Sequence, residues 1–211
     1  MCFYNFMKFV LFFLFLQKTI KTMKICQADI KYSNRIAKLI MQAMNYDCCR
    51  FFMGEGHELY EFETAMTALV EDEHSQYSYK NTLVAIDEAE SLLGICVSYD
   101  GACLRELRKA FVDMMKERFG RDFSNMTDET EAGELYIDSL AVDPQYRGHG
   151  IASCLLDATK NRAADMNLPA VGLLVDEGNP KAERLYLRKG FVFVGKNTWG
   201  GHPMRHLQYL L

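Results

Sequence analysis

The stretch that decides the fold is residues 135–152, which read LYIDSLAVDPQYRGHGIA. Its first eight residues are typical of a buried strand, and Pro144 ends that strand. Gly148 and Gly150 then form a turn before a helix. N–H groups at a helix start lack partners within the helix, and the helix dipole favours negative charge there. Because glycine has no Cβ, the backbone can approach a phosphate, and Arg147 adds a cation. The sequence therefore predicts a diphosphate-binding turn.

Two well-known phosphate-binding loops fit this turn poorly. A Walker loop requires Lys and Ser or Thr after its last glycine, whereas Ile151 and Ala152 follow here. A dinucleotide fingerprint requires a third glycine where Ser153 stands, and only about sixty residues remain downstream for the rest of such a domain. A purely structural turn between a strand and a helix stays open as an alternative.

The turn resembles motif A of the GNAT family of N-acetyltransferases, written Q/R-x-x-G-x-G/A. Gln145, Gly148 and Gly150 occupy its defined positions. Residues 179–191, NPKAERLYLRKGF, are similar to a second family signature, N-x-x-A-x-x-L-Y-x-x-x-G-F. The resemblance implies an α/β fold with a mixed, mostly antiparallel central sheet flanked by helices. It also implies a splay between the motif-A strand and the next strand.

Periodicity and turn residues predict the remaining elements. Strands are expected at 24–28, 81–87, 92–99, 171–175, 191–194 and 204–211. Helices are expected from Asp29 or Ser33 to Met44, and at 59–70, 101–119, 151–166 and 179–189. Residues 48–57 and the acidic stretch 120–133 are expected to be loops.

We predict a single GNAT domain over residues 23–211, preceded by an apolar extension over residues 1–22. The extension is expected to be dispensable or a mis-assigned start, with an interfacial anchor or a signal segment as alternatives. Residues 101–133 are long for a connection and are expected to form a helical insertion and loop near the acceptor. The loop at 48–56 is expected to form another wall of the acceptor pocket.

By resemblance, the acyl donor is acetyl-CoA. Backbone groups of Leu140, Ala141 and Val142 would hold the pantetheine arm as an added strand. The pyrophosphate would lie against the backbone of the turn and the helix start. The residues implied there are Gln145, Arg147, Gly148, His149, Gly150, Ile151 and Ala152. Asn179 would contact the cofactor arm, cap the helix that begins at Pro180, or do both.

The reaction needs a base for the amine proton and an acid for the leaving thiolate. The resemblance makes Tyr186 the acid beside the cofactor sulfur; a core tyrosine is the alternative. The resemblance also makes Glu134 our first candidate for the base, because it lies where the histone-acetyltransferase branch of the family places its catalytic glutamate, eleven residues before Gln145; Asp138 is the second candidate. Strand alternation, barring a bulge, puts five residues on one face: Glu134, Tyr136, Asp138, Leu140 and Val142. Glu134 could instead merely end the acidic stretch.

The resulting hypothesis is an N-acetyltransferase that moves an acetyl group to a primary amine of a small molecule or a protein. The alternative is a non-catalytic, acyl-CoA-binding regulatory module. Four acidic residues could attract a cationic amine, although a solvated acidic loop is the simpler interpretation. These residues are Asp128, Glu129, Glu131 and Glu134.

Composition limits the partners. The formal net charge is -4, so nothing suggests a nucleic-acid-binding face. The seven cysteines are odd in number and form no C-x-x-C pair, which favours reduced thiols and a cytoplasmic protein. Cys48 and Cys49 are expected to pack in the core rather than carry an acyl group. No metal site is expected, and no stable membrane insertion. A homodimer through strand 204–211 is a further possibility.

Overall fold

The computed structural model describes residues 22–199 and 202–211, and its framework is a seven-stranded sheet. The strands lie in the order β1-β2-β3-β4-β5-β7-β6. Their bounds are β1 Met23–Gln27, β2 Thr82–Asp87, β3 Leu92–Asp100, β4 Leu135–Val142, β5 Ala170–Asp176, β6 Val192–Trp199 and β7 His202–Leu210. Neighbouring strands are antiparallel except β4 and β5, which are parallel. The mixed, mostly antiparallel sheet is therefore confirmed.

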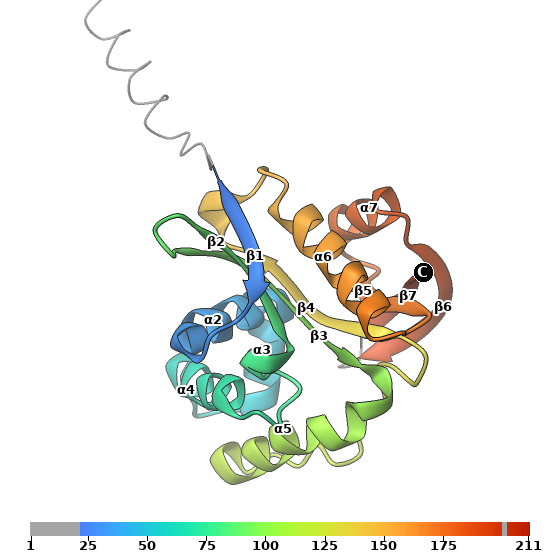
Figure 1. Ribbon diagram of the computed structural model, residues 1–211. Helices are drawn as coiled ribbons and strands as arrows, with labels where there is room; N and C mark the ends of the chain where they lie inside the picture. The colour runs from blue at the N-terminus through green and yellow to red at the C-terminus, as the bar shows by residue number, and fades with distance from the viewer. Residues whose placement is uncertain (1–21, 200–201) are drawn as a thin grey trace, which may run out of the picture.

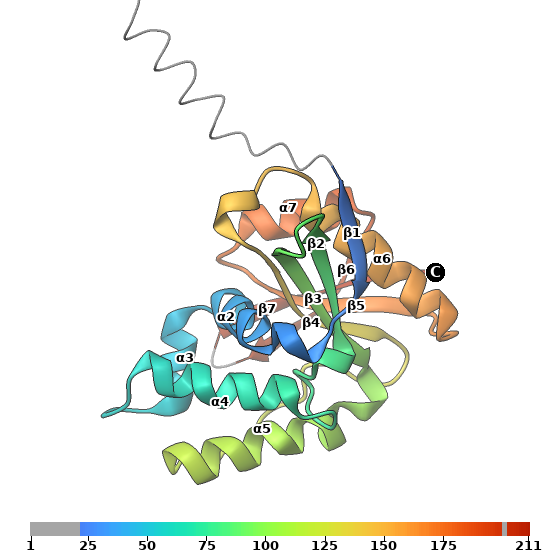
Figure 2. The same ribbon diagram turned by 60° about the vertical axis from the view of Figure 1, so that its left-hand side comes forward.

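Helices cover both faces of this sheet (Figure 1). One face carries α2 Ser33–Met44, α3 Tyr46–Met53, α4 Leu59–Glu71 and α5 Leu104–Phe119. The other face carries α6 Ile151–Asp165 and α7 Pro180–Arg188. Figure 2 shows α2, α3, α4 and α5 gathered together on their side of the strands. The two faces thus have different helical layers, and β4 lies between them.

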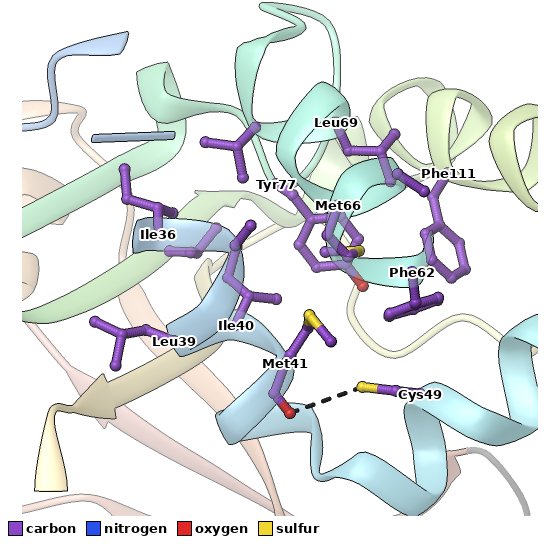
Figure 3. Close-up of a cluster of buried hydrophobic side chains, with 14 of the residues drawn as sticks. Ile36, Leu39, Ile40, Met41, Cys49, Phe62, Met66, Leu69, Tyr77 and Phe111 are labelled. Atoms are coloured by element: carbon purple, nitrogen blue, oxygen red, sulfur yellow. Dashed lines mark hydrogen bonds between the residues drawn. The ribbon is translucent and has the colours of Figure 1, made fainter. Parts of the chain in front are cut away.

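The four-helix face is held by a cluster of buried apolar side chains (Figure 3). Ile36 and Ile40 lie one turn apart on α2, and Phe62 and Met66 lie one turn apart on α4. Phe111 of α5 joins them, and all five side chains are almost fully buried. Burial of each such side chain contributes roughly 1.5–3 kcal/mol. This packing holds α5 against the layer and so positions the connection at 120–133 that follows it.

One helix, α3, lies largely where a loop was expected, so that prediction was wrong for residues 48–53. Asn45 caps the helix, because its side-chain oxygen accepts a hydrogen bond from the N–H of Cys48 at 2.9 Å. Cys49 and Phe52 are buried against the core, and Gly54 ends the helix with a φ of 76°. A helix of eight residues is too short for its apolar spacing to stand out in the sequence.

The last two strands also differ from expectation. β6 continues to Trp199, five residues beyond its expected end at Val194. β7 lies between β5 and β6, so it is internal to the sheet. The strand suggested as a dimer interface is therefore already paired on both sides. The edge left for another chain at this end of the sheet is β6.

The predicted N-terminal extension lies almost entirely outside the described residues. Of residues 1–22, only Thr22 belongs to the described residues. The first strand begins at Met23, where the domain was expected to start. Within residues 22–199 and 202–211, no helix is long and apolar enough to cross a membrane.

A bulge interrupts β4 at Asp138. Val97 of β3 lies opposite Ser139, but the next residue, Ser98, lies opposite Ile137. Asp138 is therefore the extra residue of β4, with no partner of its own in the β3 register. A bulge bends its strand and redirects the side chains that follow it.

The bulge reverses the side-chain alternation of β4. Ile137 and Leu140 both contact the cluster beneath α6, although they are three residues apart. Ala141 instead belongs to the cluster beneath α2. The expectation that Glu134, Asp138 and Leu140 share one face was therefore wrong, because it required an unbroken strand.

Candidate functional site

The site begins where β4 and β5 separate. Their parallel pairing covers three positions and ends at Ile137 opposite Leu173. β4 continues to Val142, whereas β5 stays paired with β7 up to Asp176. The splay implied by the resemblance is therefore present, and it begins beside the bulge at Asp138.

Backbone groups of β4 point into the splay in an alternating pattern. The N–H of Asp143 donates to the carbonyl of Leu93 at 2.9 Å, which fixes that pair as hydrogen-bonded. Hydrogen-bonded and non-bonded pairs alternate along antiparallel strands. Ala141 therefore bonds to β3, whereas the N–H and C=O groups of Leu140 and Val142 point away from β3 toward the splay. Of the three residues expected to hold a pantetheine arm, these two face the splay: Leu140 with its N–H and C=O groups, and Val142 with its N–H group, because the Val142 carbonyl accepts from Arg147 and Gln42.

The glycine turn follows directly. Asp143 organises it: one carboxylate oxygen accepts from the N–H of Gln145 at 3.0 Å, and the other from Arg35 at 2.6 Å. Gly148 and Gly150 have φ values of 82° and 80°, which favour glycine. A Cβ built on either glycine would meet nothing within 4 Å, so the space before the turn is open.

The start of α6 supplies the donors of this site. The helix begins at Ile151, and its N-cap Gly150 provides no side-chain hydrogen bond to the first turn. The N–H groups of the turn and of the first helical residues, Ile151 and Ala152, can therefore serve an anion. This is the geometry that the sequence predicted for a pyrophosphate.

Polar side chains around the turn are tied to the backbone. Arg147 donates from Nε to the carbonyl of Val142 at 3.3 Å, and Gln42 donates to the same oxygen at 3.2 Å. His149 places Nδ1 3.1 Å from the carbonyl of Tyr146, so a protonated Nδ1 donates there. Arg147 is exposed, which leaves its charge next to the open side of the turn.

The second motif forms α7. Asn179 caps this helix by accepting from the N–H of Ala182 at 3.2 Å, so its capping role is confirmed. Contact between Asn179 and a cofactor stays a prediction. Tyr186 packs on the α6 side, with its ring 5.9 Å from that of Phe191. Burial, together with nearby Cys96, raises the pKa of Tyr186 above its usual value. The phenol is protonated at neutral pH, as any tyrosine is, and so has a proton to donate; the raised pKa makes it a weaker acid than an exposed tyrosine.

Glu134 occupies a closed environment. Its carboxylate accepts hydrogen bonds from Thr130 at 2.6 Å, His206 at 2.9 Å and Gln208 at 2.7 Å. It lies against Gly172 of β5, where a Cβ would overlap the carboxylate. Burial acts to raise the pKa of Glu134, but these hydrogen bonds outweigh it and lower the pKa. A carboxylate held in this way is a poor proton acceptor.

Asp138 lies in a different setting, beside a second buried carboxyl. The hydroxyl of Tyr99 lies 3.3 Å from the Asp138 carboxylate and 3.2 Å from that of Glu129. Burial raises the pKa of Asp138, although Ser139, Gln76 and Tyr99 donate hydrogen bonds to it. Burial and the charge of Asp138 raise the pKa of Glu129 to about 7. Two carboxyls that share a site in this way are suited to accept a proton near neutral pH.

Polar atoms around this carboxyl pair are incompletely satisfied. Within the described residues, six buried side-chain atoms have no hydrogen-bond partner, and four of them belong to Gln76, Arg108 and Trp199. Gln76 uses its amide nitrogen on Asp138 at 3.0 Å, and Arg108 lies 3.7 Å from Glu129. Buried polar atoms are normally paired, so a concentration of exceptions points to a functional site.

A scan against protein families gives a match to the acetyltransferase (GNAT) family over residues 55–191. The chain belongs to this family. The match includes β4, the glycine turn and α7, which are the elements that carry the geometry described above.

Individual relatives agree with the GNAT assignment. The chain is 42% identical over 60 residues to a mycothiol acetyltransferase of Acidimicrobium ferrooxidans, which covers 28% of this chain and 19% of that protein. It is 28% identical over 83 residues to a spermine/spermidine N(1)-acetyltransferase of Bacillus subtilis, covering 39% of this chain and 55% of that protein. A solved acetyltransferase structure aligns with a TM-score of 0.70 and 28% identity, over 89% of this chain and 98% of that one. The chain thus spans about a fifth and about half of these two curated relatives.

The acidic stretch of this GNAT protein is not simply a solvated loop. Glu129 is buried, and Asp128 forms ion pairs with Arg105 at 2.7 Å and Arg108 at 3.2 Å. Of the four acidic residues considered, only Glu131 is exposed. Sequence reasoning named Glu129 only as a member of this stretch. No signal in the sequence placed Arg108 beside it, because Arg108 reads as an ordinary charged position on α5.

The adjacent cysteines behave as core residues. Burial raises the pKa of both Cys48 and Cys49 to about 12, so both thiols stay protonated at neutral pH. Cys49 also donates to the carbonyl of Met41 at 3.8 Å (Figure 3). A thiol in this state is a weak nucleophile, which supports transfer without an acyl-cysteine intermediate.

Proposed function

We propose that the protein transfers an acetyl group from acetyl-CoA to a primary amine of a small molecule or a protein, by direct attack in a ternary complex. The observation that carries the proposal is the splay between β4 and β5, whose open backbone edge runs into the glycine turn. An extended pantetheine arm can bond to Leu140 and Val142 as an added strand. The turn and the start of α6 then receive the pyrophosphate.

A non-catalytic acyl-CoA-binding module is the weaker candidate. Such a module needs the splay and the turn, but it has no use for a buried proton acceptor beside them. Here Asp138 and Glu129 lie next to the point where β4 leaves β5, and Tyr186 packs on the opposite face of the sheet. This pairing of an acid and a base around one opening supports turnover.

Of the two candidates for the base, the surroundings favour Asp138. Glu134 is committed to three hydrogen bonds and its pKa is lowered, whereas the pKa of Asp138 is raised. Asp138 also lies at the bulge, where the splay opens. We therefore assign Asp138, with Glu129 sharing its proton, as the base, and Glu134 as a residue that holds β7 against β4 and β5.

The chemistry then proceeds from the two faces of the sheet. The amine nitrogen attacks the acetyl carbonyl carbon, so a C–N bond forms and the oxygen becomes negative. The N–H of Leu140, which points into the splay, can stabilise that oxyanion. As the C–S bond breaks, the thiolate takes the proton of Tyr186, and the proton of the attacking nitrogen goes to Asp138.

Compartment and assembly follow as secondary proposals. The six cysteines among the described residues are free thiols, which supports a reducing, cytoplasmic setting. A homodimer, if it forms through the sheet, would use the edge strand β6. Its exposed apolar residues are Val192, Phe193 and Val194.

A pair of glycine substitutions tests the acetyl-CoA assignment. Gly148→Ala places a methyl group before the turn, and Gly56→Ala is a matched control. Both glycines have a φ of 82° and open space at the Cβ position, so both variants carry a similar backbone strain of about 1–2 kcal/mol. Calorimetry on the full-length chain should give micromolar acetyl-CoA binding to wild type and Gly56→Ala. Binding to Gly148→Ala should be at least about tenfold weaker. No acetyl-CoA binding by folded wild type, or equal binding by both variants, would contradict the proposal.

A further inference from the structure

A small aromatic cavity lies next to the carboxyl pair. It has a volume of about 220 Å³ and lies between α3, the connection at 120–133 and the end of β6. Four of its eight lining residues are aromatic: Phe51, Phe52, Phe123 and Trp199. None of the side chains that line it is charged. The cavity is smaller than the ~300–1,000 Å³ typical of sites for drug-sized ligands, so its occupant is compact.

The aromatic rings form one continuous surface. The ring of Phe52 lies 5.0 Å from that of Phe123 and 5.8 Å from that of Trp199. Phe51 extends the surface, with its ring 5.7 Å from Phe123. Such a wall favours a flat or branched apolar group that can contact several ring faces and edges at once.

The cavity is linked to the carboxyl pair through Trp199. The indole of Trp199 lies close enough to Glu129 to lower its pKa, and its buried Nε1 has no hydrogen-bond partner of normal geometry. Met126 also lines the cavity, and its backbone carbonyl accepts a hydrogen bond from Arg108 at 3.3 Å. Arg108 in turn lies 3.7 Å from Glu129. The apolar wall and the carboxyl pair are thus linked through the side chain of Trp199 and the backbone of Met126.

The charges behind the wall leave room for one cation. Asp128 and Glu129 pair with the guanidinium groups of Arg105 and Arg108, and Asp138 joins Glu129 through the hydroxyl of Tyr99. When the Glu129–Asp138 pair has lost its shared proton, three negative charges against two positive charges leave one negative charge unbalanced. A single ammonium balances it, whereas a second ammonium on the same molecule would find no carboxylate among the residues that line the cavity.

We propose that this cavity binds the acceptor, and that the acceptor is a small primary monoamine with an aryl or branched-alkyl body. The body fills the space between Phe51, Phe123 and Trp199, and the ammonium lies toward Glu129. The bound ammonium first loses one proton to water, the neutral amine attacks the thioester, and its second proton then goes to the Glu129–Asp138 pair. This inference rests on the proposed acetyl transfer.

A larger cavity nearby fits this acceptor less well. It has a volume of about 680 Å³ and is lined by residues of the α3–α4 connection together with Arg121. Its walls mix the charges of Arg50, Glu55 and Glu58, and they include neither Trp199 nor Glu129. Phe51 borders both cavities. A polar acceptor bound there would have no direct contact with the carboxyl pair.

A panel of amines separates the alternatives. Thiol release by the full-length chain should be measured with acetyl-CoA and phenethylamine, isoamylamine, spermidine or glucosamine. We expect kcat/KM for phenethylamine or isoamylamine to exceed that for spermidine and glucosamine by at least about tenfold. Equal or higher kcat/KM for spermidine or glucosamine would overturn the inference and leave the proposed function standing. Failure to bind acetyl-CoA would overturn both.

Substitutions in the wall test the location. Trp199→Ala and Phe51→Ala should raise KM for phenethylamine at least fivefold, with acetyl-CoA affinity unchanged. Phe51 is 49% exposed, so its truncation spares the core, and Tyr60→Ala, at a residue 69% exposed and outside both cavities, is the matched control. An unchanged KM in both wall variants, or an equal rise in Tyr60→Ala, would overturn the assignment. Glu129→Gln should raise KM for the amine more than KM for acetyl-CoA; the reverse order would also overturn it.

Discussion

Replacing Glu134 separates a structural carboxylate from a catalytic one. We expect Glu134→Gln to lower stability while most acetyl transfer persists. The carboxylate is 1% exposed and accepts three hydrogen bonds, from Thr130, His206 and Gln208. A glutamine amide keeps the shape but presents an NH₂ group to these donors, so at least one hydrogen bond is lost.

The magnitude follows from that loss. A hydrogen bond to a charged group contributes about 1.5–3 kcal/mol, and the substitution also leaves a buried donor facing another donor. We therefore expect a loss of about 2–4 kcal/mol in the free energy of unfolding at pH 7. For a chain of this size, 1 kcal/mol shifts Tm by about 2–4 °C, so Tm should fall by roughly 4–16 °C.

The pH dependence of this stability has a definite sign. Because folding lowers the pKa of Glu134, its contribution is fully present above the ordinary carboxyl value of 4.5. The contribution is lost as the pH falls through the lower, folded-state pKa. The stability difference between wild type and Glu134→Gln should therefore be largest at neutral pH and shrink in acid.

Urea unfolding at pH 7 and in acid, together with steady-state thiol release, measures both effects. Asp138→Asn is the counterpart, and we expect its kcat to fall at least about a hundredfold, since general-base catalysis contributes about 10²–10⁴. If Glu134→Gln unfolds like wild type and loses a hundredfold or more in kcat, Glu134 is the base. Our assignment of Asp138 would then be refuted.

Two further predictions concern the acid and the working pH. Tyr186→Phe should lower kcat by about 10²-fold while acetyl-CoA affinity stays within about twofold, because the phenol acts on the leaving thiolate rather than on binding. Unchanged turnover would show that Tyr186 is not the acid. The pH profile of kcat/KM should rise through about 7. The reason is that the Glu129–Asp138 pair must lose a proton before it can accept one from the amine, and the pKa of Glu129 is raised to about 7. This rising limb should be lost in Asp138→Asn, and a profile that is flat from pH 6 to 8 in wild type would contradict the carboxyl pair as base.

The donor end of the site was predictable from the sequence because its parts are local. A strand, two glycines and a helix start lie within residues 135–152, and the chemistry there belongs to the backbone. Gly148 and Gly150 adopt the positive φ values that their residue type favours. The splay follows from the same segment, since β4 outlasts its pairing with β5.

The acceptor end was not predictable because its parts are distant in sequence. Tyr99 comes from β3, Arg108 from α5, Glu129 from the connection after α5, and Trp199 from the extended end of β6. Each residue looks ordinary in its own segment, and only the tertiary fold brings them together. The predicted alternation of side chains along β4 was also wrong. The bulge at Asp138 changes the register by one residue, and the apolar pattern of the sequence does not show it.

The bulge explains how one strand can serve both ends. Before it, Ile137 faces α6 while β4 still pairs with β5; after it, Leu140 again faces α6 and lies along the splay. The residue between, Asp138, is thereby directed to Tyr99 and Gln76 on the other side of the sheet. In the mechanism that we propose, the donor is held by backbone groups that any apolar sequence provides, while the acceptor meets side chains from separate elements. Those side chains can change without disturbing the glycine turn, so we expect the aromatic cavity, rather than the turn, to select the proposed acceptor.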